Sequence, residues 1–178
     1  MPHYVRFRLD DDAVAALGAL RARLREAGID APPTGTGPGS CRSGVAPDER
    51  PDVTVAAAAA VPRPARDALV AELRLVALPA LWLATLGSVT GDDERLVLAA
   101  VTDPEVLAVH TAVHDVLAGR VRSPFAAHLP GSWLPHVVLA RSRPAEAFAL
   151  LHPVGSVRAR ITAVELHDTR TGETDILT

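Results

Sequence analysis

Two short stretches of the chain share one shape and carry the side chains best suited to chemistry. In "WLPHVVLAR" His136 follows a proline, and in "RPDVTVAAA" Asp52 stands at the corresponding place. Side chains two residues apart in a strand point to one face, so His136 shares a face with Val138, and Asp52 with Thr54. An imidazole exchanges protons near neutral pH, and a hydroxyl donates hydrogen bonds to anionic oxygens. This residue set suits acid–base chemistry on an anionic group.

The two stretches resemble the paired motifs of the two-histidine phosphoesterase superfamily, which includes the 2'-5' RNA ligase and 2',3'-cyclic phosphodiesterase proteins. Its members carry His-x-Thr or His-x-Ser twice, often within "PHxTLA", once in each lobe of a bilobal fold. The matching residues here are Pro51, Thr54 and Ala56 in the first stretch, and Pro135, His136, Leu139, Ala140 and Arg141 in the second. The resemblance in the order of elements covers nearly the whole chain.

The resemblance implies a mechanism in which a cyclic phosphate opens between two imidazoles. One imidazole takes a proton from the attacking oxygen, and the other gives a proton to the leaving oxygen. The two hydroxyl groups donate hydrogen bonds to phosphate oxygens that gain charge in the transition state. Carried over to this chain, the resemblance gives catalytic roles to His136, Asp52 and Thr54. It places Val138 and Arg141 in contact with the substrate.

Each motif departs from the superfamily pattern at one position. Asp52 replaces the first histidine, and Val138 replaces the second hydroxyl residue. An ionised carboxylate about 5 Å from a phosphate opposes its binding by roughly 3 kcal/mol at an effective dielectric near 20. Asp52 is also a weak base, because an ordinary aspartate has a pKa near 3.9. We therefore expect hydrolysis of 2',3'-cyclic nucleotides to be slow or absent.

Three functional hypotheses follow from these departures. In the first, the chain is a superfamily member that acts on a small phosphate ester or on an RNA end with a 2',3'-cyclic phosphate. In the second, it is a non-catalytic module that binds such a ligand in the same cleft. In the third, Asp52 and His136 form the acid–base pair of an enzyme with another substrate. A simpler interpretation makes His136 a hydrogen-bond partner of Asp52, and Asp52 an exposed residue at the end of a strand.

Other residues are weaker candidates for a site. Four arginines on alternating strands could line the cleft, although such arginines usually lie on a solvated sheet face: Arg6, Arg8, Arg158 and Arg160. His110 and His114 have the i, i+4 spacing of a metal site, but no third ligand is apparent and packing is the better interpretation. "TGTGPGS" lacks the Lys-Ser/Thr ending of a phosphate-binding P-loop. We expect no metal and no cofactor.

Composition and charge limit the classes of partner. The chain has 178 residues, 48% of them hydrophobic, and a net charge of -3. These values predict a globular protein without an extended nucleic-acid footprint. Cys41 is the single cysteine, which excludes an intrachain disulfide. The first residues contain no apolar signal segment, and no apolar run reaches the roughly 18 residues of a membrane span, so we expect a cytoplasmic protein. The oligomeric state stays open.

Hydrophobic periodicity predicts the elements that must position these residues. The predicted strands are 3–9, 51–61, 80–89, 95–102, 133–141, 156–169 and 174–178, and the predicted helices are 13–28, 63–77, 104–119 and 143–152. The run of alanines after Val55 has helical propensity, but Pro51 and the resemblance favour a strand. Residues 31–49 are rich in Gly, Pro and Ser and are expected to form a loop beside the cleft.

The order of these elements repeats once along the chain, which indicates a weak internal duplication. Each motif stretch follows a helix and a loop, and each is followed by another helix and then a strand pair. The sequence therefore predicts an α+β fold with residues 1–178 as one domain. That domain has two pseudo-symmetric lobes, each a small, mainly antiparallel sheet with flanking helices, around a central cleft.

Overall fold

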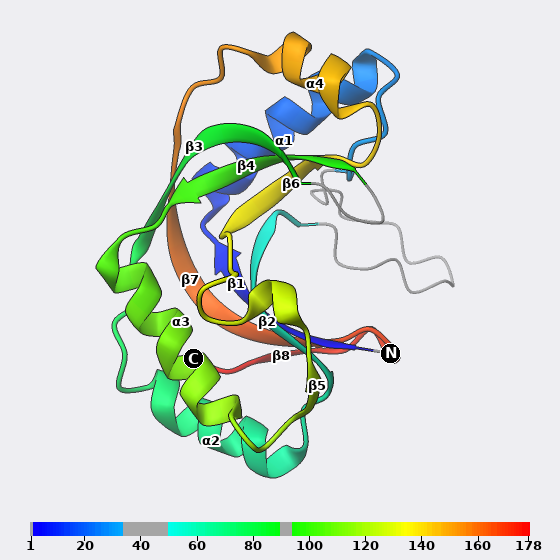
Figure 1. The fold of residues 1–178 in the computed structure, drawn as a ribbon. Coiled ribbons are helices and arrows are strands. Elements are labelled where there is room, and N and C mark those ends of the chain that lie inside the picture. Colours follow the sequence, from blue (N-terminus) through cyan, green and yellow to red (C-terminus); the bar gives the residue numbers. More distant parts are fainter. Residues whose placement is uncertain (1, 34–49, 90–93) are drawn as a thin grey trace.

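The computed structural model describes residues 2–33, 50–89 and 94–178 (Figure 1). Within these residues the chain forms eight strands, four α-helices and one 3-10 turn. The strands are β1 (His3–Leu9), β2 (Asp52–Ala60), β3 (Ala80–Val89), β4 (Arg95–Val101), β5 (Arg122–Pro124), β6 (His136–Ala140), β7 (Val157–Asp168) and β8 (Thr174–Ile176). The helices are α1 (Asp11–Glu26), α2 (Arg63–Leu73), α3 (Pro104–Leu117) and α4 (Pro144–Leu151), and the 3-10 turn is η1 (Ala126–His128). Most of the predicted loop at 31–49 lies outside the described residues.

All strand pairings among the described residues are antiparallel, and the strand order is β5-β2-β1-β7-β3-β4-β6, with β8 also paired to β7. The long strand β7 joins two halves, because its residues 157–160 pair with β3 and its residues 161–168 pair with β1. One lobe therefore contains β1, β2 and β5, and the other contains β3, β4 and β6. The predicted α+β, bilobal architecture is confirmed.

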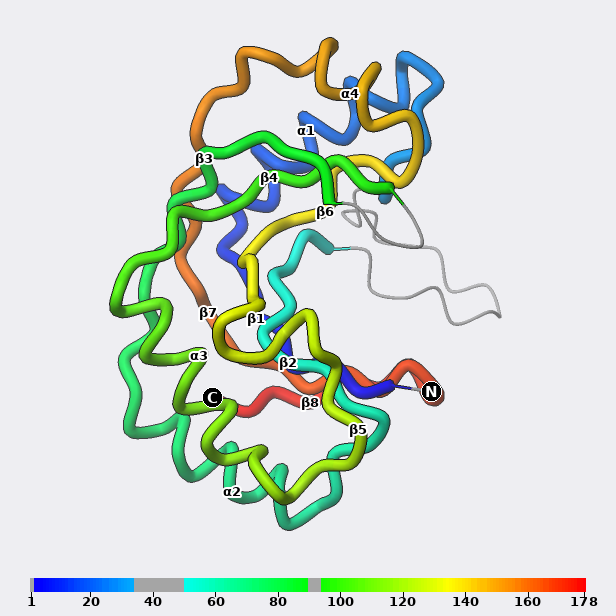
Figure 2. Tube along the Cα trace, in the orientation of Figure 1, coloured from blue at the N-terminus to red at the C-terminus, as the bar shows by residue number. Residues whose placement is uncertain are grey.

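The helices exchange between the lobes. Helix α1 follows β1 in the chain but packs with α4 on the lobe of β3, β4 and β6, whereas α3 follows β4 and packs with α2 on the lobe of β2 (Figure 1). In each lobe, helices therefore cover one face of the sheet, and the other face borders the space between the lobes. In that space β2 and β6 run beside each other (Figure 2). In the described part of the chain, no helix is long and apolar enough to cross a membrane.

The alternation of buried and half-buried residues explains why the motif strands present their polar side chains to one side. In β1, Val5, Phe7 and Leu9 are fully buried in the core between sheet and helices. Strand β2 follows the same rule up to Val55, and its alanine run continues as a strand. The strand prediction for the alanines is confirmed, because their small side chains let β2 pack closely against β1 and α3.

The irregular segment between α3 and β6 contains two elements that hydrophobic periodicity does not predict. Strand β5 is short and pairs with the end of β2, where Ala58 lies opposite Pro124. The turn η1 follows it directly and ends at His128. With three residues each and no periodic segment beside them, β5 and η1 carry too little periodicity to be detected in the sequence.

Candidate active site

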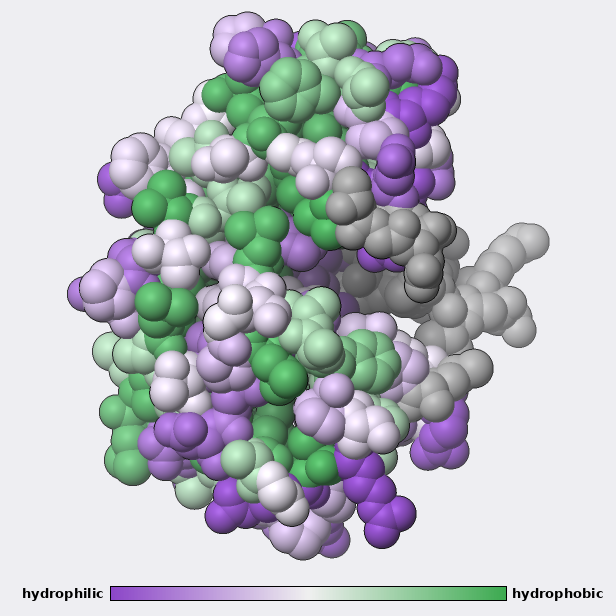
Figure 3. Space-filling view, in the orientation of Figure 1, coloured by the Kyte–Doolittle hydropathy of each residue, from purple (hydrophilic) through white to green (hydrophobic). Residues whose placement is uncertain are grey.

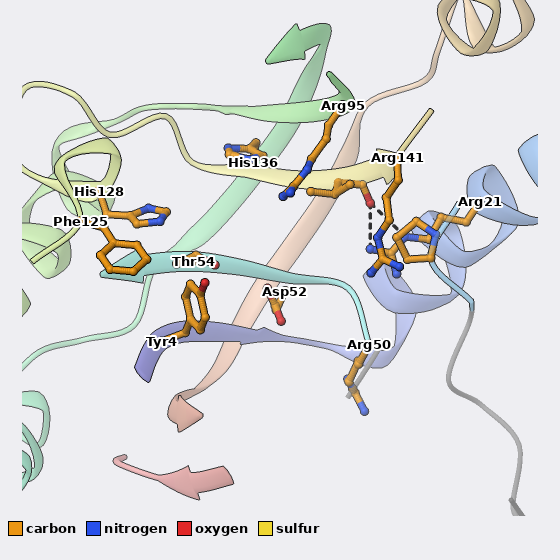
Figure 4. Close-up of a pocket in the computed structure, with 12 residues that line it drawn as sticks. Tyr4, Arg21, Arg50, Asp52, Thr54, Arg95, Phe125, His128, His136 and Arg141 are labelled. Carbon is orange, nitrogen blue, oxygen red and sulfur yellow. Dashed lines mark hydrogen bonds between the residues drawn. The ribbon is translucent and has the colours of Figure 1, made fainter. Parts of the chain in front are cut away.

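A cavity of about 300 Å³ lies between the two lobes. All five residues that the sequence predicts for the site line it (Figure 4): Asp52, Thr54, His136, Val138 and Arg141. Hydrophilic residues gather in the hollow between the lobes (Figure 3). The two motifs therefore meet at one concave place, the first from β2 and the second from β6.

Asp52, at the start of β2, is engaged by an arginine from the neighbouring strand. The Arg6 guanidinium donates a hydrogen bond to the Asp52 carboxylate, with Nη1 and Oδ2 3.0 Å apart. Arg6 is only 6% exposed and also forms an ion pair with Glu165 at 3.6 Å. Arg8 contacts Glu165 at 3.3 Å. Asp52 is therefore part of a cross-strand charge network, and its negative charge is offset where it faces the cavity.

Thr54 lies two residues further along β2 and points to the same side. Its side chain is half-buried at the cavity wall (Figure 4), and its carbonyl oxygen accepts a hydrogen bond from the Trp133 indole at 2.8 Å. The next carbonyl, that of Val55, accepts a hydrogen bond from the His114 Nε2 at 3.2 Å. Side chains from α3 and from the segment before β6 thus fix β2 at the point where it carries the hydroxyl.

His136 begins β6 on the opposite side of the cavity. Its Nδ1 lies 2.7 Å from the carbonyl oxygen of Leu134. Because a carbonyl only accepts, Nδ1 carries a proton, and Nε2 keeps its lone pair when the ring is neutral. Burial lowers the pKa of His136 below 6.5, the Leu134 hydrogen bond partly opposes this, and the charge of Arg95 lowers the pKa further. The ring of His136 therefore takes up a second proton less readily than a free imidazole, and an anion beside it would favour the charged form.

Val138 offers no hydroxyl, but its backbone is firmly held. The Arg21 guanidinium donates two hydrogen bonds to the Val138 carbonyl oxygen, at 2.8 Å from Nη2 and 3.1 Å from Nε. Arg21 comes from α1 and is 4% exposed. Strand β6 is at the edge of the sheet, so this arginine satisfies a carbonyl that no further strand pairs with in the described structure.

The cavity wall carries an excess of positive charge. Its four arginines outnumber the single carboxylate of Asp52, and they come from α1, from two residues before β2, from β4 and from the residue after β6: Arg21, Arg50, Arg95 and Arg141. Arg50 contacts Asp11 at 2.6 Å and donates to the Leu9 carbonyl. Guanidinium groups bind phosphate oxygens with directed hydrogen bonds, so this wall suits a phosphate ester.

The other end of the cavity is aromatic and contains a second histidine. Tyr4 and Phe125 meet edge to face, with ring centroids 6.4 Å apart, and His128 lies beside them on η1 (Figure 4). Burial lowers the pKa of His128 to about 4, and the charge of the facing His136 adds to that shift. The two imidazoles of the cavity therefore influence each other.

The weaker candidates have structural contacts instead. Arg158 lies over the Trp82 ring at 4.9 Å, and Arg160 contacts Asp10 at 3.3 Å. Arg6 and Arg8 lie on the same sheet face as Asp52 but bind carboxylates, as described above. His110 is buried and stacks on Trp133 with a centroid distance of 4.0 Å, and its neighbour His114 lies 4.4 Å from it. Among the described residues, no group of three or more His, Cys, Asp or Glu residues could hold a metal ion.

Several cavity residues were not singled out by the sequence analysis, and some of them had a signal. Arg21 occupies a position on the apolar stripe of α1, between the buried Leu17 and Leu24, where a charged residue needs an internal partner. Tyr4 alternates with Arg6 on β1. His128 lies in a segment with no predicted element, and its sequence neighbours give no indication of the site.

The comparisons with known proteins support the same architecture. No protein-family model and no curated protein matches the sequence. Usb1 from Kluyveromyces marxianus is similar in structure, with a TM-score of 0.54 and 10% identity over 99% of this chain and 97% of that one. The PDE domain of MHV ns2 has a TM-score of 0.50 and 12% identity over 98% of this chain and 96% of that one. The chain therefore has the fold of these two proteins.

Proposed function

We propose that the chain is a phosphoesterase that binds a 2',3'-cyclic phosphate, on an RNA end or a small nucleotide, and opens it slowly. The observation that carries this proposal is that His136 and Thr54, from opposite lobes, line one cationic cavity. A fold shared with a protein described as a PDE domain adds support. The volume of the cavity, about 300 Å³, fits one nucleotide-sized ligand and no extended strand.

The proposed binding mode uses residues from both lobes. Arg141 and Arg95 offset the phosphate charge, and the Thr54 hydroxyl donates a hydrogen bond to a phosphate oxygen. His136 serves as the general acid, because the Leu134 carbonyl stabilises the protonated ring through Nδ1 while Nε2 faces the leaving oxygen. Arg6 reduces the repulsion between Asp52 and the phosphate, since it lies 3.0 Å from that carboxylate.

A binding module without catalysis is the second candidate. The observation that favours it is the engagement of Asp52 by Arg6, which places a salt-bridged carboxylate where the superfamily has its first histidine. The same contact argues against an enzyme that uses Asp52 and His136 as its acid–base pair, because a carboxylate held by a guanidinium is a poor proton carrier. Turnover therefore separates the two remaining candidates.

The test is hydrolysis of 2',3'-cyclic AMP by the purified chain. We expect measurable turnover that falls by about 10²-fold or more in His136→Ala, the usual contribution of one positioned acid or base. His152→Ala is the matched control, because His152 is exposed and stacks on Phe148 of α4 away from the cavity. Turnover equal in the parent and in His136→Ala would place the reaction elsewhere. Binding of the nucleotide without turnover would favour the binding module.

A further inference from the structure

The histidine on η1 is held firmly in the lobe of β2. The backbone N–H of Phe125, just before η1, donates to the Ala57 carbonyl of β2 at 2.9 Å. The carbonyl of His128 accepts a hydrogen bond from the His110 Nε2 of α3 at 2.9 Å. Within η1, the N–H of His128 donates to the Phe125 carbonyl at 3.1 Å. The turn is therefore anchored to both β2 and α3, and its last residue has a fixed position beside Thr54.

The ring of His128 points into the cavity. It lines the same space as Thr54 and His136, and Figure 4 shows it extending from η1 toward those two residues. In the described part of the chain no hydrogen bond occupies its ring nitrogens, whereas His110 and His114 each donate to a backbone carbonyl. Both ring nitrogens of His128 are thus left for a ligand in the cavity.

Opening a cyclic phosphate requires two proton-transfer groups, and the motif strands provide only one of them. His136 is one imidazole, and Asp52 is bound to Arg6. We propose that His128 is a catalytic residue that supplies the second imidazole, so that η1 restores to the lobe of β2 the group that β2 itself lacks. This inference rests on the proposed function.

The reaction balances with water as the only co-reactant. The neutral ring of His128 accepts a proton from water while the water oxygen forms a bond to phosphorus. The bond between phosphorus and one ribose oxygen breaks, and His136 transfers its proton to that oxygen. The product is a nucleoside monophosphate, and a proton returns from His128 to His136 through solvent to complete the cycle.

The electrostatics of the cavity fit this assignment of roles. The imidazoles that face His128 lie on β6 and α3 and are those of His136, His110 and His114, and the phenol of Tyr4 from β1 lines the same end of the cavity. Two close imidazoles resist carrying two protons at once, so binding a phosphate between them favours a state with one proton. His136 is the better holder of that proton because of its Leu134 carbonyl, which leaves the neutral ring of His128 to act as the base once a bound phosphate raises its pKa.

Kinetics of three single variants test the inference with 2',3'-cyclic AMP as substrate. We expect His128→Gln and His136→Gln each to lower kcat by about 10²-fold, and His152→Gln to leave it unchanged. The acidic limb of the pH–rate profile, where the rate falls as the pH is lowered, reports protonation of the base. The residual rate of His128→Gln should therefore lack this limb. A variant that is merely less stable would keep the limb.

A measurement on the parent chain keeps the inference testable if His128→Gln fails to fold. Inorganic phosphate, titrated into the protein, should raise the pKa of the His128 ring as followed by its NMR resonances, because an anion beside a ring favours its charged form. An unchanged His128 ring together with a phosphate-sensitive His136 ring would overturn the inference. Turnover that depends on His136 but is equal in the parent and in folded His128→Gln would also overturn it and would leave the proposed function standing. No turnover by the parent chain would overturn both.

Discussion

Strands β2 and β6 carry corresponding stretches, and each departs at a different position from the superfamily pattern that it resembles. Strand β2 keeps the hydroxyl of Thr54 and has an aspartate in place of the histidine. Strand β6 keeps His136 and has Val138 in place of the hydroxyl residue. Both pairs still face one cavity, because the period-two alternation of the strands is intact.

The two altered positions are compensated in different ways. At β2 an arginine contacts the side chain of the differing residue, since Arg6 donates a hydrogen bond to the Asp52 carboxylate. At β6 an arginine contacts the backbone of the differing residue, since Arg21 donates a hydrogen bond to the Val138 carbonyl. In both cases a buried arginine from the first 21 residues completes the arrangement. The comparison teaches that positions 52 and 138 are integrated into the fold, and that the cavity brings together one imidazole and one hydroxyl from the two strands.

Removing Arg6 should break the arrangement at β2 with the largest effect. Arg6→Met leaves Asp52 without its guanidinium partner and weakens the pairing of Glu165, and loss of one partner of a buried ion pair typically costs about 3–5 kcal/mol. We expect the free energy of unfolding in urea to fall by about 3 kcal/mol. Arg158→Met, on an exposed face over Trp82, should cost less than about 1 kcal/mol. Equal losses in the two variants would mean that the charge network at β2 contributes nothing specific.

Lowering the pH should show that the half-buried imidazole of His128, in the lobe of β2, is shielded from solvent in the folded chain. The pKa of His128 is about 4 in the folded chain and near 6.5 when the chain is unfolded. Between these values the unfolded chain binds more protons, so the folded state loses stability as the pH falls, and the loss levels off below pH 4. From pH 7 to pH 4.5 the parent should lose about 2 kcal/mol more than His128→Gln, after allowing for partial solvent screening.

Urea unfolding at several pH values measures this difference. His152→Gln serves as the control, and its stability should follow that of the parent chain through the same range. Parallel curves for the parent and His128→Gln would show that the ring of His128 is solvated in the folded state, and that it is not enclosed with His136 in the cavity.

The part of the site that follows from local pattern was predictable from the sequence. The alternation of side chains predicts that Asp52 and Thr54 share one face of β2 and that His136 lies on one face of β6. The resemblance of the motifs predicts that these two faces meet. The contact between Arg6 and Asp52 joins residues 46 positions apart, and it depends on which strands become neighbours. His128 depends on the placement of a three-residue turn by β2 and α3, for which no local signal exists. Tertiary arrangement therefore determines the features that distinguish the two halves of the site.

Restoring both motifs should have a smaller energetic effect than the two stability changes above, and it acts on the free energy of the transition state. It nevertheless tests the comparison between β2 and β6 most directly. In Asp52→His with Val138→Thr, a new imidazole faces His136 and a new hydroxyl faces Thr54. The fold should tolerate both changes. Arg6 retains Glu165 at 3.6 Å, threonine has nearly the shape of valine, and Arg21 binds the backbone of position 138 and not its side chain. Removal of the carboxylate also lifts its repulsion of a phosphate.

We expect hydrolysis of 2',3'-cyclic AMP by the double variant to exceed that of the parent chain by at least about tenfold, a modest share of what a positioned acid or base contributes. Asp52→His alone should give most of this gain, because it supplies the proton-transfer group, whereas Val138→Thr alone adds only one hydrogen-bond donor. If the new imidazole takes over as base, His128→Gln in the double-variant background should lower the rate far less than it does in the parent. A folded double variant with no gain would mean that the cavity is shaped for a different ligand, and the binding module would then be the better description of this chain.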